Sequence, residues 1–197
     1  MNATTTTPTH VATTDALGAI LAENVGVVEQ LQSTSAVSLE AAAESLRTAD
    51  RIFVLGAGRS GLALKMTAMR LMHLGLDVHV VGEVTAPAIT GGDVLLVASG
   101  SGTTGAIVRA AETASALGVT IVALTTDAAS TLAKLAQVTV VIPAAAKQDH
   151  GGPLSVQYSG GLFEQSVLLV GDSLFHTLWK DSGATAEQLW PRHANLE

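Results

Sequence analysis

Two turns rich in glycine and hydroxyl residues, each directly after a short apolar run, constrain the fold of this 197-residue chain most. The first run, 51–55, is followed by GAGRSG at 56–61, and the second, 94–98, by SGSGTTG at 99–105. Both runs have the length and apolar character of strands, and each turn opens a helix-like stretch. Such a turn binds anions, because free backbone N–H groups and the helix dipole point at one spot. We therefore expect an α/β fold with an anionic ligand at these turns.

Strand-like and helix-like segments alternate along the middle of the chain, which predicts a parallel sheet with helices on both faces. Such a three-layer α/β/α sandwich binds ligands at the carboxyl ends of its strands, where both turns lie. The five expected strands are 51–55, 77–81, 94–98, 120–125 and 138–142, and the helices between them are 61–73, 104–117 and 130–136. Further helices are expected from Asp15, from Ser38 as a cap to Thr48, over 162–181 and over 184–190.

The chain reads as one domain. Residues 1–14 are threonine-rich with few large apolar side chains, and we expect a flexible tail there. Residues 15–197 have the length of a single domain with a substantial core. Residues 143–161 are polar and glycine-rich without a clear period, which is typical of a functional loop.

Composition excludes several classes of function. A net charge of −7 argues against sequence-independent nucleic-acid binding, and no apolar stretch approaches the ~20 residues of a membrane-spanning helix. The chain has no cysteine, and residues 1–14 lack the features of a signal peptide, so we expect a cytoplasmic protein. With 48% hydrophobic and 14% charged residues, we expect apolar surface to be buried between subunits of a homo-oligomer.

The glycine spacing in 56–61 also matches the dinucleotide-binding fingerprint, and Glu83 could be its acidic partner. A dinucleotide site does not explain the cation and the hydroxyl of Arg59 and Ser60 inside this turn. It also does not explain the second turn at 99–105. Hydroxyls with no lysine nearby suit a compact phosphate ester, so a sugar phosphate is the expected ligand and no nicotinamide cofactor is expected. The alternative for the second turn is a loop in which Thr103 or Thr104 only caps the next helix.

Several ionisable and sulfur-containing residues have open roles. Glu164 falls in the first turn of helix 162–181, where it is either a solvated acid that favours the dipole or a general base at the mouth of the sheet. His193 lies in a polar terminal segment, which can still reach a site. The six histidines show no metal-ligand spacing, so no metal is expected. The methionines at 66, 69 and 72 are expected in the core.

With these motifs in place, the chain closely resembles the 6-phospho-3-hexuloisomerases, which belong to the sugar isomerase (SIS) domain family. The resemblance runs from about residue 15 to the C-terminus and rests on GRSG at 58–61, AMRLMH at 68–73, SGSG at 99–102, LFEQ at 162–165 and RHANLE at 192–197. The closing RHANLE is very specific, whereas the serine turn alone only indicates a SIS domain.

The resemblance implies isomerisation of D-arabino-hex-3-ulose 6-phosphate to fructose 6-phosphate, in the ribulose monophosphate route of formaldehyde fixation. It also implies a five-stranded parallel sheet, homotetramers, no metal and no cofactor, and a functional link to 3-hexulose-6-phosphate synthase. By motif, Glu164 is the proton acceptor, and the substrate-binding residues are Arg59, Ser60, Ser99, Gly100, Ser101, Gly102, Thr103 and Thr104. His193 is expected to act in a site made mostly by another subunit.

Three positions depart from what the resemblance leads us to expect. Many relatives have glutamate where this chain has Thr103, arginine where it has Val156, and serine or threonine where it has Gly161. Loss of a cation and a hydroxyl near the site would lower affinity or shift substrate choice. The rival class is a non-catalytic SIS module that senses a sugar phosphate, and such a sensor would not need Glu164.

Overall fold

The computed structural model describes residues 10–144 and 155–196. The chain begins with two helices, α1 (Thr13–Thr34) and α2 (Ala36–Thr48), and ends with α6 (Gly161–Ser182), α7 (Ala186–Leu189) and a 3₁₀ turn (Trp190–Arg192). Between them lie β1 (Ile52–Gly56), α3 (Gly58–Leu74), β2 (Val78–Val80), β3 (Val94–Ala98), α4 (Gly105–Ala116), β4 (Thr120–Thr125), α5 (Thr131–Leu135) and β5 (Val138–Val141). Residues 1–9 of the predicted tail, and most of the predicted loop 143–161, lie outside the described residues.

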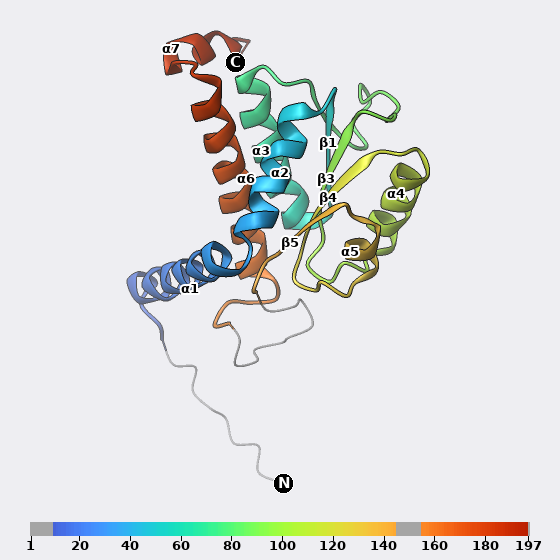
Figure 1. Cartoon of the computed structure of the whole chain (residues 1–197). Coiled ribbons are helices and arrows are strands. Elements are labelled where there is room, and N and C mark those ends of the chain that lie inside the picture. The colour runs from blue at the N-terminus through green and yellow to red at the C-terminus, as the bar shows by residue number, and fades with distance from the viewer. Residues whose placement is uncertain (1–9, 145–154, 197) are drawn as a thin grey trace.

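The five strands form one parallel sheet in the order β2-β1-β3-β4-β5. Successive side chains of a strand point to opposite faces, so Leu96 packs with α2, α3 and α6, and Leu95 with α4 and α5. Figure 1 shows these two helical layers on either side of the sheet. The predicted three-layer α/β/α sandwich is confirmed, with all five strands at the expected places.

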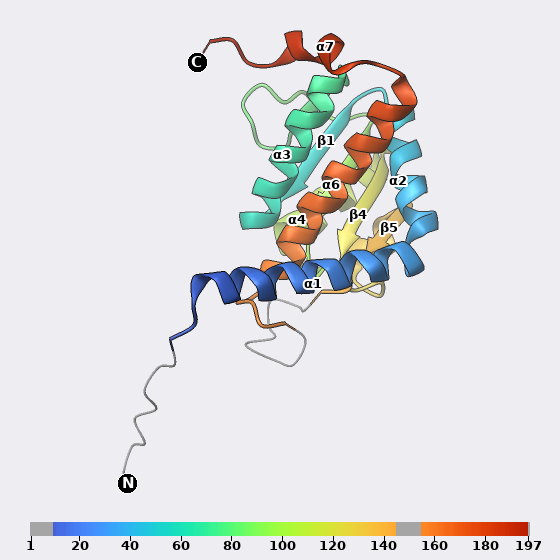
Figure 2. The ribbon, with the colours of Figure 1, turned by 90° about the vertical axis from the view of Figure 1, so that its left-hand side faces the viewer.

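The prediction for the start of α2 is wrong by three residues, because the N-cap position is Ser35 and not Ser38. The helix begins at Ala36, because only Ser35 separates it from α1. Ser38 does not cap it, and its hydroxyl instead donates to the Ser35 carbonyl at 3.0 Å. At the other end of the molecule from α1, α7 and the 3₁₀ turn follow the long helix α6 (Figure 2).

Helices α3 and α6 pack closely against each other on one face of the sheet. Their approach requires a glycine, since a Cβ at Gly171 would overlap the hydroxyl of the buried Thr67. The predicted core methionines do not contribute, because Met66, Met69 and Met72 of α3 are 50%, 54% and 39% exposed. That prediction is wrong. Among the described helices, none is both long and apolar enough to cross a bilayer.

Candidate active site

The two predicted turns meet at one edge of the sheet. Gly56, the last residue of β1, is in register with Ala98, the last residue of β3, so both turns start side by side. They enclose a small pocket of about 40 Å³ lined by Ala57, Ser60, Ala98, Ser99, Gly100, Ser101 and Thr104. Ser60 and Ser99 are almost fully buried, at 3% and 4% exposure. The structure thus brings the predicted serines of the two turns together.

The glycines of the first turn have a packing role. A Cβ at Gly61 would overlap the carbonyl of Gly56, so the end of β1 and the start of α3 can approach only without side chains. This packing accounts for the fingerprint-like spacing without a dinucleotide. Glu83, the acidic residue that a dinucleotide site would use, forms an ion pair with Lys65 at 2.7 Å.

The second turn is held by its own hydroxyls and by β4. Thr104 occupies the N-cap position of α4, but its side chain makes no capping hydrogen bond. Its hydroxyl instead lies 3.1 Å from that of Ser99. Ser101 Oγ accepts hydrogen bonds from the backbone N–H and the hydroxyl of Thr103, at 3.3 and 3.1 Å. The interpretation of Thr104 as only a helix cap is therefore not supported.

Hydrogen bonds from residues at the end of β4 hold the backbone of this turn in place. The Gly100 carbonyl accepts hydrogen bonds from the hydroxyls of Thr125 and Thr126, at 3.0 and 2.8 Å. Gly102 has a φ of 59°, and a Cβ there would overlap the side chain of Ser130. A pocket whose backbone is held this way is preorganised for a ligand, which lowers the entropy lost on binding.

Glu164 lies in the first turn of α6, as predicted, and its side chain is only 6% exposed. Its amide donates to the carbonyl of Gly160, which precedes the helix in a left-handed conformation with φ 81°. The alternative of a solvated acid is therefore wrong. Burial of a carboxylate is costly unless it is paired, and Arg59 Nε lies 2.9 Å from Glu164 Oε2.

Arg59, which the resemblance includes among the substrate-binding residues, pairs with Glu164 in this structure and does not line the serine pocket. Its side chain is 66% exposed and reaches across from the start of α3 to the Glu164 carboxylate. Together they border a groove of about 190 Å³ between α3 and α6, lined further by Leu62, Ala63, Met66, Gln165 and Leu168. Because Ser60 is the next residue along α3, the ion pair and the serine pocket are neighbours.

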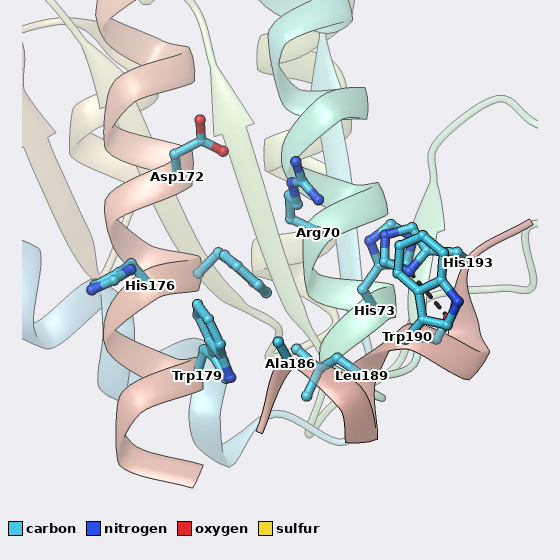
Figure 3. A pocket seen from close by; sticks show the side chains of 10 residues that line it. Arg70, His73, Asp172, His176, Trp179, Ala186, Leu189, Trp190 and His193 are labelled. Carbon is cyan, nitrogen blue, oxygen red and sulfur yellow. Dashed lines mark hydrogen bonds between the residues drawn. The ribbon is translucent and has the colours of Figure 1, made fainter. Parts of the chain in front are cut away.

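His193 is not near Glu164 within the chain. Its ring stacks on His73 with 3.9 Å between centroids, and on Trp190 with 4.6 Å. A helix rises about 21 Å between residues 59 and 73, so His193 lies at the far end of α3 from Arg59. Figure 3 shows it at the edge of a second cavity, of about 400 Å³, that Arg70, Asp172, His176 and Trp179 also line.

His73 itself is buried at 3% exposure, and its Nδ1 has no hydrogen-bond partner in the structure. Burial, with further contributions from His193 and Arg70, lowers the pKa of the His73 imidazole. The shift favours the neutral form of the His73 imidazole, on which the His193 ring stacks. Within residues 10–144 and 155–196, no group of three or more His, Asp or Glu side chains could hold a metal ion.

Two residues of α1 that were not predicted from the sequence contact the first turns of α6 and the segment before it. Glu23 accepts hydrogen bonds from the segment 155–157, and Asn24 Nδ2 donates to Gln165 Oε1 at 2.7 Å. The apolar period of α1 contains no sign of this, because the partners lie more than 130 positions away along the chain. Of the departures noted above, Val156 is exposed, and Gly161 is packed against Gln157.

Comparisons with known proteins agree with this geometry. The model of the SIS domain family matches residues 45–161. The chain is 58% identical over 147 residues to the 3-hexulose-6-phosphate isomerase of Mycobacterium gastri, covering 75% of this chain and 74% of the relative. It is 38% identical over 156 residues to the Bacillus subtilis enzyme of the same name, covering 79% and 84%.

A solved structure from Methanococcus jannaschii has the same fold. Its description infers the function of a 3-hexulose-6-phosphate isomerase. The TM-score is 0.79 with 25% identity, over 93% of this chain and 99% of that one. The matched family model, the curated relatives and the parallel sheet with its two serine-lined turns lead to one conclusion: this chain belongs to the SIS domain family.

Proposed function

We propose that this protein is a 3-hexulose-6-phosphate isomerase, which interconverts D-arabino-hex-3-ulose 6-phosphate and D-fructose 6-phosphate. The observation that carries the proposal is the buried carboxylate of Glu164, paired with Arg59, whose neighbour Ser60 lines the serine pocket at the carboxyl ends of β1 and β3. A sensor of sugar phosphates needs the pocket but not the carboxylate. The names of the curated relatives also favour the isomerase over a non-catalytic module.

The reaction moves a carbonyl from C3 to C2 of the sugar and needs no oxidant. Glu164 removes the proton from C2, and the electron pair of that bond forms the C2–C3 double bond while O3 takes the negative charge. A proton then passes from O2 to O3 in the resulting cis-enediolate, and Glu164 returns its proton to C3. One base on one face of the enediolate thus serves both steps.

The phosphate of the substrate is expected at the serine pocket, away from the reacting carbons. Ser60, Ser99, Ser101 and Thr104 supply hydroxyls there, and the N-terminus of α4 supplies backbone N–H groups. Binding energy gained at the phosphate fixes the sugar for proton transfer. The exposed Arg59 side chain is long enough to move from Glu164 to an oxygen of the bound substrate, which takes one cation away from the carboxylate before it accepts the proton.

The proposal includes a homo-oligomer, with a tetramer implied by the family resemblance. Leu62, Met66 and Met69 form an apolar stripe along α3, and all three are at least half exposed. Apolar surface of this kind is typical of an interface. The Glu164 site lies at one end of this stripe and His193 at the other.

A two-fold axis across the middle of the stripe would superpose its two ends, because such an interface uses the same patch of both copies. His193 of one copy would then approach Glu164 of the other. There it would donate a hydrogen bond to the enediolate oxygen or assist ring opening. This arrangement would give His193 a role, although within its own chain it stacks on His73, far from Glu164.

We propose that the enzyme follows an aldol-type step that joins formaldehyde to ribulose 5-phosphate, as in the ribulose monophosphate route, because such a step yields the proposed substrate. We propose 3-hexulose-6-phosphate synthase as its functional partner, because the relatives are named for the isomerisation of that enzyme's product. We also propose the cytoplasm as its location, as expected from the composition of the chain. The test combines both proteins with formaldehyde and ribulose 5-phosphate and measures fructose 6-phosphate. Fructose 6-phosphate should form only when both proteins are present. If none forms with both proteins present, the proposed isomerase activity is refuted.

A further inference from the structure

Three hydrogen bonds join Glu23 of α1 to the segment that leads into α6. The carboxylate accepts from Ser155 Oγ at 3.1 Å, from the Val156 backbone N–H at 2.7 Å and from Gln157 Nε2 at 3.0 Å. The neighbouring Asn24, which is 9% exposed, donates to Gln165 just after Glu164. Helix α1 therefore makes hydrogen bonds both before Glu164, to residues 155–157, and after it, to Gln165.

Among the residues that the structure describes, few other contacts hold this segment in place. Val156 and Tyr158 are 76% and 88% exposed, so the segment buries few apolar side chains. A segment with few buried contacts opens easily unless polar contacts fix it. The carboxylate of Glu23 bonds to three successive residues and is thus its main attachment among the described contacts.

The position of the segment is passed on to Glu164 through a short series of contacts. Gln157 packs on Gly161, where an added Cβ would lie 3.2 Å from its Oε1. The Gly161 amide donates to the Tyr158 carbonyl at 3.1 Å, and the Glu164 amide donates to the Gly160 carbonyl at 3.0 Å. We therefore expect a shift of 155–157 to move the first turn of α6.

The backbone between the segment and α6 depends on such support. Ser159 has a φ of 20°, which is unusual for a residue other than glycine, and Gly160 follows with φ 81°. Non-glycine residues keep such a conformation when the surrounding structure over-determines it. The same segment forms a wall of a cavity of about 560 Å³ that Arg59 and Gly161 also line, so it borders the partner of Glu164 as well.

We propose that Glu23 is a positioning residue, which holds Glu164 in the place where it can transfer a proton. The catalytic part of this inference rests on the proposed isomerase function. Glu23 does not touch the substrate; it acts through Gln157 and Gly161 on the first turn of α6. A displaced base loses rate steeply, because a shift of about 1 Å can cost on the order of 100-fold.

The experiment compares Glu23→Ala and Glu23→Gln with Glu29→Ala, which removes an exposed carboxylate from the same helix. In Glu23→Ala, kcat should fall by about 10- to 100-fold, while KM and inhibition by inorganic phosphate stay close to the parent values. Glu23→Gln should recover part of kcat, since its amide oxygen can still accept the Val156 N–H. Circular dichroism checks that each variant is folded.

Hydrogen exchange gives a readout that needs no substrate. The amides of Val156 and Glu164 should exchange faster in Glu23→Ala than in the parent and in Glu29→Ala. Unchanged exchange at both amides, or a kcat equal to that of Glu29→Ala, would overturn the proposal. If the parent shows no isomerase activity, the proposed function fails, and exchange at the Glu164 amide still decides whether Glu23 positions that turn.

Discussion

Replacing Glu164 by glutamine tests the base most directly, because the substitution keeps the shape of a side chain that is 6% exposed. Glutamine cannot accept the proton, and loss of a general base lowers the rate by about 10²- to 10⁴-fold. This corresponds to roughly 2.7–5.4 kcal/mol of barrier. We expect the loss in kcat, since the phosphate pocket is built from other residues.

The stability effect of Glu164→Gln should be small. Arg59 loses an ionic partner, but its side chain is 66% exposed and can return to solvent or bond to the new amide oxygen. Pairs with an exposed member contribute at most about 1 kcal/mol, which for a domain of this size lowers Tm by about 2–4 °C. The tight packing of α6 against α3 is untouched.

The assay follows fructose 6-phosphate formation from the hexulose phosphate at saturating substrate, with the exposed Glu112→Gln as the matched control. Inhibition by inorganic phosphate, measured on the residual activity, reports whether the serine pocket is intact. A Glu164→Gln variant that is folded, binds phosphate and turns over within about tenfold of the parent would refute the assignment of the base.

Four further outcomes are expected. Ser101→Ala should weaken substrate and phosphate binding by roughly 1.5–3 kcal/mol, with Thr113→Ala on α4 as the control; equal phosphate inhibition in both would contradict the pocket. Treatment with EDTA should leave the rate unchanged, and a loss that a divalent ion restores would require a metal. Mixing Glu164→Gln and His193→Ala subunits should restore activity if His193 acts across an interface; no recovery after confirmed exchange would place both in one chain or remove His193 from catalysis. Gly171→Ala should lower the free energy of unfolding by about 1–3 kcal/mol in a denaturant titration, because the new Cβ overlaps Thr67; an unchanged midpoint would contradict the close helix contact.

The sheet and the two turns are readable from the sequence because their signals are local. A run of apolar residues with strand length, a glycine turn and a helical period each extend over fewer than about 20 residues. The parallel arrangement then follows from the alternation of these elements, and parallel strands place both turns at one edge. The position of Glu164 in the first turn of α6 is local in the same sense.

The local spacing of apolar residues also led to one wrong prediction, that of the core methionines. Met66, Met69 and Met72 have helical spacing beside a buried stripe, yet they lie on the outer side of α3. Spacing along a helix says which residues share a face, but whether another helix or a second chain covers that face depends on the whole assembly.

The chemistry of the site was decided by contacts between distant segments. Arg59 and Glu164 are far apart in the chain and belong to two helices, α3 and α6, that pack against each other, with Gly171 allowing a close approach at Thr67. Glu23 also meets its partners, and His193 meets His73, through tertiary contacts that have no fixed spacing in the sequence. The sequence by itself therefore determined which residue types stand at the carboxyl edge of the sheet. Only the tertiary structure decided which of them are paired, buried or separated, because those properties depend on how the helices pack across the sheet.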